Sequence, residues 1–364
     1  MHELGLDTTN LNPVHGTPLN PYNKSYYPGG SSGGSASATA SGVVPITLGA
    51  DGGGSIRVPS SYCGIYGLKP SHNRISGSPT PSLAASTGVL GPMAANMLDL
   101  ELAYRIMTTP DPNNATQSLF PPPSPISKPF LQQTKQKPTI ALCTPWLDRA
   151  DPAVQNLFNA TLAHLTKALS YATANIEIAH LHAGQQAHAL TILAEIATGA
   201  PPLSSLSAPS KILLATGAQT PAPIFLQAQK IRHALMQHLS SLFAAHPEGL
   251  IILTPATPNA GWRIRPGEQA HGASNANMSV RAMEYVWLAN FTGCPAITAP
   301  MGYADAEGGG VVPVGVMAMG EWGSEEALLG FGYEMERFLE QEVEGGRRRP
   351  EVCVNPLEMA RQRV

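Results

Sequence analysis

Two clusters of glycine and serine residues near the start of the chain have the residue types and the spacing to do chemistry. They are Gly29–Ala36, with the sequence GGSSGGSA, and Leu48–Arg57, with the sequence LGADGGGSIR. The first cluster taken alone is typical of a flexible linker. A linker gives no reason, however, for a second glycine run that ends in a serine and an arginine, beyond a segment, Ser37–Pro45, whose small and apolar residues can pack. The pair therefore indicates a functional site.

Familiar catalytic and phosphate-binding motifs do not explain the two clusters. A phosphate-binding loop needs the pattern GxxxxGK[ST], and no lysine follows either cluster directly. A G-x-S-x-G nucleophile elbow is also missing, and no histidine stands where a Ser/His/Asp triad could be recognised. Surface or core positions are the favoured interpretation for the histidines on helical or loop segments, such as His164, His180, His233 and His238.

Three consecutive glycines before a serine have a definite physical consequence. They let successive backbone N–H groups point at one spot, and they keep side chains out of it, which is the geometry of an oxyanion hole beside a nucleophile. We therefore predict Ser55 as the nucleophile, with the N–H groups from Gly52 to Ser55 as donors. A serine hydroxyl is a poor nucleophile at neutral pH and needs a base. With no histidine placed, we expect a second serine that relays the proton from a neutral lysine.

The two clusters resemble those of the amidase signature family of serine hydrolases. The resemblance extends over nearly the whole chain, although residues 109–248 match only loosely. The further segments that carry it are Cys63–Ser71, Arg74–Ser76, Gly88–Met93, Asn290–Ala296 and Pro313–Val316.

The resemblance implies a role for each serine of the site. Ser55 would accept the acyl group of an amide substrate. Ser31 would be the relay residue, which the family places on a cis peptide bond. Ser32 would orient that pair by hydrogen bonding. The implied activity is hydrolysis of a carboxamide through an acyl-enzyme, with release of ammonia or an amine.

The resemblance also assigns the residues around the nucleophile. Gly52, Gly53 and Gly54 would line the oxyanion hole, and Asp51 and Arg57 would form a supporting charge pair that fixes the loop. The family commonly carries a hydroxyl or branched residue at the position of Gly52, so the loop is expected to be slightly looser here, with its N–H group still in place.

The general base is the serious departure from the family pattern. In the family it is a lysine well before the first cluster, and only thirty residues precede Ser31, so we expect this lysine to lie before Met1. Lys69 belongs to a GLKP motif that the family carries in addition to the catalytic lysine, and it is predicted to be structural. Lys24 falls in what we predict to be an exposed polar turn, whereas a base must be desolvated to be neutral at pH 7.

Three functions remain open. The first is an amidase, and the second is an inactive, truncated relative that acts as a binding or interaction protein. The third is the A-type component of an amidotransferase acting on charged tRNA, which requires partner subunits. Loss of the N-terminal segment would expose an unpaired sheet edge. The simplest account of the missing lysine is that Met1 is an internal methionine of a longer protein.

Composition limits the partners and the compartment. The formal net charge of −3 argues against a nucleic-acid-binding surface, and the basic run Arg347–Arg349 is interpreted as a solvated tail. No apolar signal segment or membrane-spanning run is present in the sequence. We expect a cytoplasmic protein with a small-molecule amide substrate and no metal or cofactor, and we allow for a homodimer. Buried, reduced thiols are expected at Cys63, Cys143, Cys294 and Cys353.

The chain is long enough and apolar enough to bury a large core, with 364 residues of which 43% are hydrophobic. Apolar runs that alternate with helical periodicity favour a layered α/β sheet. The resemblance implies the amidase signature fold, a mixed twisted sheet with helices on both faces, lacking its N-terminal part. We expect one domain over residues 1–364, with a Pro-rich connection at 109–137 and a C-terminal tail at 343–364.

Individual elements follow from periodicity. Strands are predicted at 138–142, 249–253, 296–299 and 311–319, with short strands or turns at 43–48 and 64–68. Helices are predicted at 97–107, 152–171, 277–290 and 324–341, and the central stretch that follows residue 171, up to about residue 245, is largely helical in pattern. Three residues could line the acyl pocket, although core packing is the favoured interpretation for each: Tyr62, Met93 and Phe291.

Overall fold

The computed structural model describes the chain apart from residues 81, 125–136, 269, 351–352 and 354–364. The described residues form one mixed sheet of eight strands in the order β1-β3-β2-β7-β8-β6-β4-β5. Neighbouring strands are antiparallel from β1 to β6 along this order, whereas β6, β4 and β5 run parallel. The strands are β1 Ile46–Asp51, β2 Tyr66–Lys69, β3 Val89–Ala94, β4 Thr139–Leu142, β5 Thr173–Asn175, β6 Leu250–Pro255, β7 Ala296–Asp305 and β8 Val311–Met319.

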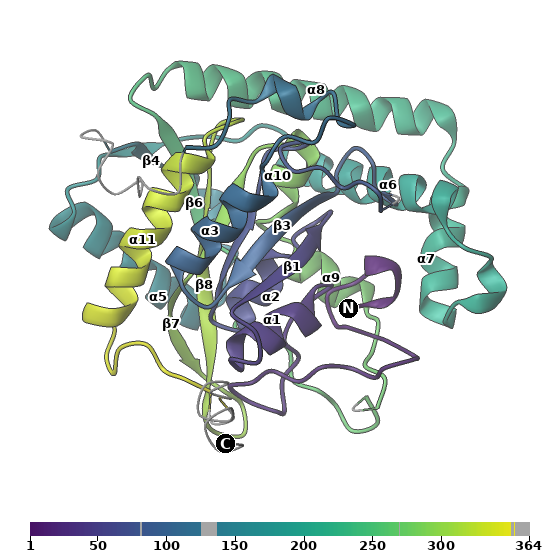
Figure 1. Cartoon of the computed structure of the whole chain (residues 1–364), viewed down its shortest axis with the longest axis horizontal. Coiled ribbons are helices and arrows are strands. Elements are labelled where there is room, and N and C mark those ends of the chain that lie inside the picture. The colour runs from purple at the N-terminus through teal and green to yellow at the C-terminus, as the bar shows by residue number, and fades with distance from the viewer. Residues whose placement is uncertain (81, 125–136, 269, 351–352, 354–364) are drawn as a thin grey trace.

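Helices cover both faces of this sheet (Figure 1). On β7 the side chain of Ile297 faces Gly332 of α11, and the next residue, Thr298, lies beside Ser61 of α2. Because successive strand residues point to opposite faces, α11 and α2 lie on opposite faces, as predicted for this fold. The helices are α1 Gly33–Ala40, α2 Arg57–Tyr62, α3 Met97–Met107, α4 Thr144–Leu147, α5 Pro152–Ala163, α6 Leu181–Gly199, α7 Ala208–Ala218, α8 Ala222–Ala244, α9 Ala276–Ala282, α10 Trp287–Thr292 and α11 Glu325–Gln341.

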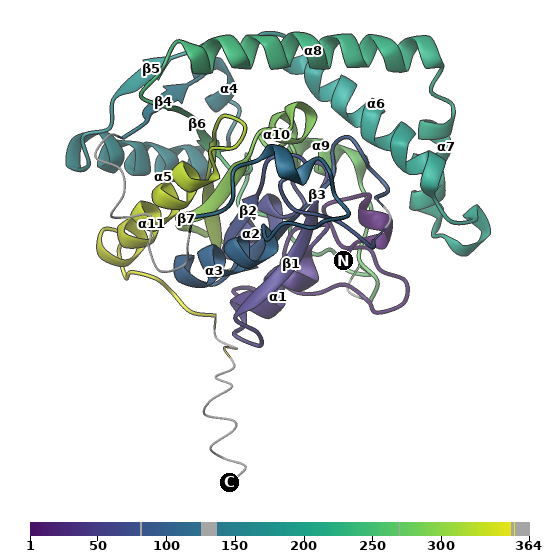
Figure 2. The same cartoon turned by 45° about the horizontal axis from the view of Figure 1, so that its top comes forward.

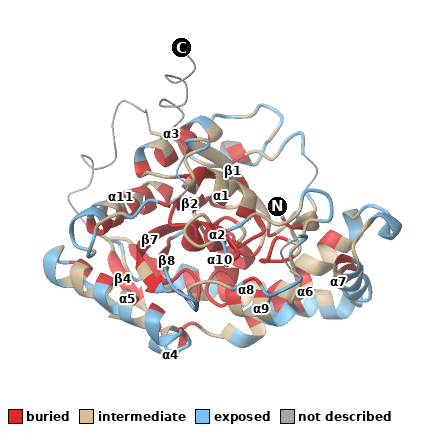
Figure 3. Cartoon of the chain, turned by 90° about the horizontal axis from the view of Figure 1, so that it is seen from below, coloured by how far each residue is buried: buried red, intermediate tan, exposed pale blue. Residues whose placement is uncertain are grey.

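Helices α6, α7 and α8 form a helical lobe, residues 181–244, beside the sheet (Figure 2). The lobe meets α10 at Gly184 of α6, where Trp287 and Leu235 approach so closely that a Cβ atom would lie 2.5 Å and 2.8 Å from them. Buried residues gather in the sheet and in α2 and α10, whereas α7 is mostly exposed or half-buried (Figure 3). The lobe is therefore anchored through its inner helix, and this anchoring brings α6 toward the Leu48–Arg57 cluster.

Strand β3 was not predicted, and β1 begins later than expected. The β3 segment contains Gly91 and Pro92, residue types that weaken a strand interior, yet β3 pairs with both β1 and β2. The run predicted at 43–48 forms a strand only from Ile46, directly after Pro45, which has no N–H to donate to a ladder.

The helix predicted at 277–290 is interrupted between α9 and α10. The carbonyl of Glu284 accepts a hydrogen bond from Trp146 Nε1 at 3.2 Å, and the carbonyl of Val286 accepts one from Arg57 at 2.8 Å. These carbonyls are therefore bound by side chains from other parts of the chain. The helix predicted at 152–171 ends as α5 at Ala163 and continues as a π-helical turn over His164–Ala168.

The remaining predictions about organisation are only partly covered by the described residues. The Pro-rich connection is described up to Ser124 and again from Lys137, and the tail up to Pro350 and at Cys353; the other residues of both lie outside the described part. Cys63, Cys143 and Cys294 are buried and free as predicted, but Cys353 is exposed because it lies beyond the packed core. Of the described helices, none has the length and apolar character to cross a membrane.

Candidate active site

The Leu48–Arg57 cluster forms the end of β1, a tight loop and the start of α2. The loop turns at Gly54, whose φ is +112° and where a Cβ atom would lie 2.3 Å from Val286 Cγ2. A side chain is thus excluded at Gly54 both by the backbone conformation and by the neighbouring wall. Ser55 follows it directly and is half-buried, so it stays accessible at the head of α2.

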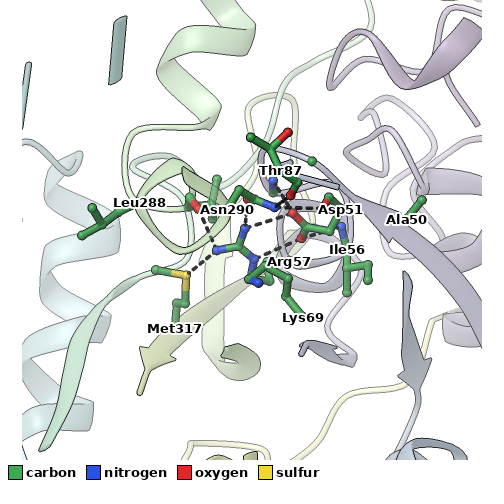
Figure 4. A network of polar contacts seen from close by, with 12 residues as sticks. Ala50, Asp51, Ile56, Arg57, Lys69, Thr87, Leu288, Asn290 and Met317 are labelled. Atoms are coloured by element: carbon green, nitrogen blue, oxygen red, sulfur yellow. Dashed lines mark hydrogen bonds and ion pairs between the residues drawn. The ribbon is translucent and has the colours of Figure 1, made fainter. Parts of the chain in front are cut away.

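Asp51 and Arg57 form the predicted charge pair in a fully buried position (Figure 4). The Asp51 carboxylate accepts hydrogen bonds from Arg57 Nε and Nη2, both at 3.0 Å, and from the N–H groups of Gly54 at 2.7 Å and Ile56 at 3.0 Å. Burial alone would raise the pKa of Asp51, but the Arg57 guanidinium and these hydrogen bonds hold it below its usual range. The ionised carboxylate therefore fixes the loop on both sides of Ser55.

The Arg57 guanidinium also binds groups far away in the sequence (Figure 4). It donates to the Val286 carbonyl at 2.8 Å and to Asn290 Oδ1, and it contacts Met317 Sδ at 3.3 Å. Asn290 Nδ2 in turn donates to the Asp51 carbonyl at 2.8 Å. Prediction missed Asn290 as a site residue, although it begins the segment Asn290–Ala296 that carried part of the family resemblance.

The hydrogen bonds of Asp51 determine which N–H groups of the loop are left to bind an anion. The N–H of Gly54 is used by Asp51, so Gly54 shapes the turn and does not supply the N–H donor that was predicted for it. The N–H groups of Gly52, Gly53 and Ser55 make no hydrogen bond to the described residues. Three N–H groups of this kind in one loop can stabilise an oxygen that acquires negative charge next to the Ser55 hydroxyl.

The Gly29–Ala36 cluster lies against this loop. The peptide bond between Gly30 and Ser31 is cis, and Ser31 is buried. Ser32 joins the two clusters, since its N–H donates to the Ser55 carbonyl at 3.2 Å. The Ser32 hydroxyl binds the main chain of Ala50 instead, at 3.2 Å to the N–H and 3.3 Å to the carbonyl. Ser32 thus orients the Ser55 backbone through its own main chain, because its side chain is occupied by strand β1.

The two hydroxyls themselves have no partner: neither Ser31 Oγ nor Ser55 Oγ forms a hydrogen bond within the described residues. Ser31 is covered by the N-terminal turn, since a Cβ atom on Gly5 would lie 3.4 Å from its Oγ, and the His2 N–H donates to its carbonyl at 3.0 Å. Ser31 is therefore more deeply buried than Ser55, which is half-buried.

The two lysines near the clusters, Lys24 and Lys69, differ in burial. Lys24 is exposed, as predicted. Lys69 ends β2 and is fully buried; burial, and then the nearby Arg57, lower the pKa of Lys69 to about 7. Its Nζ donates to the Pro70 carbonyl at 2.7 Å. Strong desolvation of Lys69 could not be foreseen from the GLKP motif, because it depends on the packing of β2 in the middle of the sheet.

The helical lobe contributes two residues that prediction missed. Ile192 of α6 occupies the space beside Gly52, where a Cβ atom would lie 2.8 Å from Ile192 Cδ1. His188, one turn earlier, lies with Nε2 2.8 Å from the Gly52 carbonyl oxygen.

Phe291, Tyr62 and Met93 are fully buried, in agreement with core packing. Among the described residues, no group of three or more His, Cys, Asp and Glu side chains is placed to bind a metal.

Comparison with known proteins gives consistent matches. The family model described as Amidase matches residues 1–329, which include both clusters. A fatty acid amide hydrolase of Medicago truncatula is 31% identical over 341 residues, covering 90% of this chain and 54% of that protein. The A-type component of the glutamyl-tRNA(Gln) amidotransferase of Thermus thermophilus is 29% identical, covering 90% of this chain and 72% of its own length. The chain spans little more than half the length of the plant relative.

Solved structures agree on the fold. A protein from a vestigial complex linked to the origins of an s-triazine catabolic enzyme has a TM-score of 0.81 and 27% identity, covering 96% of this chain and 74% of that one. A 6-aminohexanoate cyclic dimer hydrolase, with a TM-score of 0.80 and 22% identity, covers 97% of this chain and 76% of its own, and supports the fold alone.

Proposed function

Because this chain belongs to the amidase family, we propose that it cleaves an amide C–N bond by transferring the acyl group of a small-molecule substrate to the Ser55 hydroxyl. The observation that carries the proposal is the loop before Ser55. Its Gly52 and Gly53 N–H groups are unengaged within the described residues, while the buried pair of Asp51 and Arg57 holds it in place. Such a preorganised pocket is what acyl transfer requires.

In the proposed reaction the Ser55 oxygen attacks the carbonyl carbon of the amide, and the loop N–H groups stabilise the charge on the carbonyl oxygen. The Ser55 proton passes to Ser31 while Ser31 gives its own proton to a base. The proton then returns by this relay to the leaving nitrogen, the C–N bond breaks, and ammonia or an amine departs. Water next attacks the ester on Ser55 by the same relay and releases a carboxylic acid.

The base at the end of the relay is a lysine in the family pattern, and we propose that neither Lys24 nor Lys69 takes this role. Lys24 is exposed, so it lacks the desolvated surroundings that a lysine base requires. Lys69 is desolvated, but its Nζ is bound to the Pro70 carbonyl. No described lysine forms a hydrogen bond with Ser31 or Ser55.

The surroundings of Gly52 support an amide with an apolar acyl group. An apolar cluster lies against this side of the loop, through Ile192 and Ala84, which approach Gly52. The relative from Medicago truncatula is named a fatty acid amide hydrolase, which is in line with such a substrate. The cluster consists of Ala84, Ile196 and Leu214, with Leu4, Leu6, Leu83 and Ile192 among the residues packed against it.

A fluorophosphonate probe, which reacts with activated serines, tests the proposal. We expect covalent labelling of the folded chain at Ser55 and no labelling of Ser55→Ala. In Ser31→Ala, loss of the proton relay should slow labelling by about 100- to 10,000-fold. Ser35→Ala is the matched control, because the Ser35 hydroxyl only binds the Leu48 carbonyl, at 2.9 Å, and its labelling should equal that of the wild type.

The outcomes separate the three functions. Labelling of the isolated chain, followed by turnover of a fatty acyl amide in preference to acetamide, supports the amidase. Labelling that appears only after the other components of an amidotransferase are added favours the third function. Absence of labelling under either condition, in a chain shown to be folded by circular dichroism, contradicts the proposal and favours the inactive binding protein.

A further inference from the structure

His188 lies in α6, and the fold brings its side chain against the loop that precedes the nucleophile. The residue is 1% exposed. Its ring meets the ring of Phe291 edge-on, with centroids 5.9 Å apart, and lies 6.5 Å from that of Trp287. These two aromatic side chains belong to α10, so the orientation of the imidazole is set by the contact between the helical lobe and the core.

The polar contact of His188 defines its tautomer. Nε2 lies 2.8 Å from the Gly52 carbonyl oxygen, and a carbonyl oxygen only accepts, so Nε2 carries the proton and donates. Nδ1 is then unprotonated, and it is buried without a partner among the described residues. Burial lowers the pKa of His188 to about 4, although the bond to Gly52 opposes this shift. The imidazole is therefore neutral at neutral pH.

The Gly52 carbonyl controls the direction of a catalytic donor. In a planar trans peptide the carbonyl of one residue and the N–H of the next point in opposite directions. The hydrogen bond from His188 thus turns the Gly53 N–H away from α6. The ring also lies close to Gly53, where a Cβ atom would be 3.0 Å from His188 Cε1.

The loop needs such a restraint because glycine has the least intrinsic backbone preference. The following peptide is already restrained, since the Gly54 N–H donates to Asp51 at 2.7 Å. His188 and Asp51 therefore hold the two peptide groups on either side of Gly53, one through a carbonyl and the other through an N–H.

We propose that His188 is a positioning residue of the acyl-transfer site, which keeps the Gly53 N–H directed at the substrate carbonyl oxygen. The proposal rests on the proposed function of Ser55. It predicts that His188 affects the chemical step more than substrate binding, because the hydrogen bond from the N–H strengthens as the oxygen becomes negative.

The test measures the rate of fluorophosphonate labelling in two variants at His188. His188→Met fills a similar volume without a donor, and its maximal labelling rate should fall by about 10- to 100-fold, with the half-saturating probe concentration unchanged. His188→Gln offers an amide N–H in place of Nε2 and should recover the rate to within a few-fold.

Thr191→Val is the control for a general loss of packing in α6. Thr191 is fully buried one turn after His188, and its hydroxyl binds the Ala187 carbonyl at 2.7 Å and accepts from Gln229. We expect this variant to lower the melting temperature without changing the labelling rate.

Two results would overturn the inference while leaving the proposed function intact. One is a wild-type rate in a folded His188→Met variant. The other is an equal slowing in Thr191→Val at the same loss of thermal stability, which would mean that packing of α6 alone matters. If the wild-type chain itself is not labelled, the proposed function fails and the inference fails with it.

Discussion

The loop before Ser55 is supported from two sides, and the two supports differ in kind. On the inner side the ions of Asp51 and Arg57 and the amide of Asn290 are all buried, and they are joined by several hydrogen bonds. On the outer side the lobe offers one neutral hydrogen bond from His188 and the apolar end of Ile192. We therefore expect the inner support to decide whether the loop forms, and the outer support to adjust the direction of one peptide group.

The two supports also differ in the free energy that is lost when one of their members is removed. A buried carboxylate whose partner is removed has no water to replace it, so the inner network tolerates little change. The outer contacts involve no charge, and the lobe that carries them is mostly exposed or half-buried on α7 (Figure 3). Variation in the lobe can therefore change the site without unfolding the sheet.

The largest effect is expected from removing the inner cation. Arg57→Met leaves the Asp51 carboxylate buried without its cationic partner and should lower the free energy of unfolding by about 3–5 kcal/mol, measured by urea denaturation, with loss of labelling at Ser55. Arg263→Met provides the control, because it breaks an exposed ion pair with Glu307, a kind of pair whose contribution is about 1 kcal/mol or less. Equal losses of unfolding free energy in the two variants would mean that the inner network contributes no more to stability than an exposed ion pair.

The second prediction concerns Lys69, which is buried near the inner network. Its pKa is about 7 in the folded chain and ordinarily 10.5. Between these values the unfolded chain binds more protons than the folded chain, so this lysine makes the free energy of unfolding increase with pH, by up to about 1.4 kcal/mol per pH unit. Below pH 7 both states are protonated and the contribution levels off.

The measurement for Lys69 is a difference between two pH profiles of stability. Unfolding free energies of the wild type and of Lys69→Met are compared from about pH 7 to about pH 9, below the range in which tyrosines of the unfolded chain ionise. The wild-type profile should rise relative to that of the variant. Parallel profiles would mean that Lys69 keeps its ordinary pKa in the folded chain.

The smallest effect is expected on the outer side, at the contact of Gly52 with Ile192. Gly52→Ala places a methyl group 2.8 Å from Ile192 Cδ1 and should cost about 1 kcal/mol of stability. In the Ile192→Val background, which lacks that atom, the same change should cost less by about 0.5 kcal/mol or more. Gly77→Ala is the control, since a Cβ atom there meets nothing within 4 Å. The same loss of stability in both backgrounds would show that Ile192 does not restrict the space for a side chain at Gly52.

Much of the site could be predicted because its parts are close in sequence. Ser55, the three glycines before it and the pair of Asp51 and Arg57 all fall within one short segment. Residues this close in sequence are also close in space, so their types and spacing were enough to predict that they share one site. The Gly54 N–H was predicted as a donor for an anion and instead binds Asp51, because whether an N–H group stays free depends on how the Asp51 carboxylate is oriented.

The break between α9 and α10 shows why other features escaped prediction. Nothing in the local sequence says that the Val286 carbonyl will be bound by Arg57, which lies 229 residues earlier. Strand β3 was missed for a related reason, since its glycine and proline weaken a strand locally, and its pairing with β1 and β2 is not visible in the segment itself.

By itself, the sequence determined the amidase family, the candidate nucleophile and the short loop that carries its N–H donors, because these depend on contiguous residue types. The tertiary structure alone decided which distant groups hold that loop. Asn290 and His188 lie 239 and 136 residues from the atoms that they bind, and their residue types occur equally well in a core or on a surface. Only the packing of α10 and the helical lobe against the sheet places them at the site.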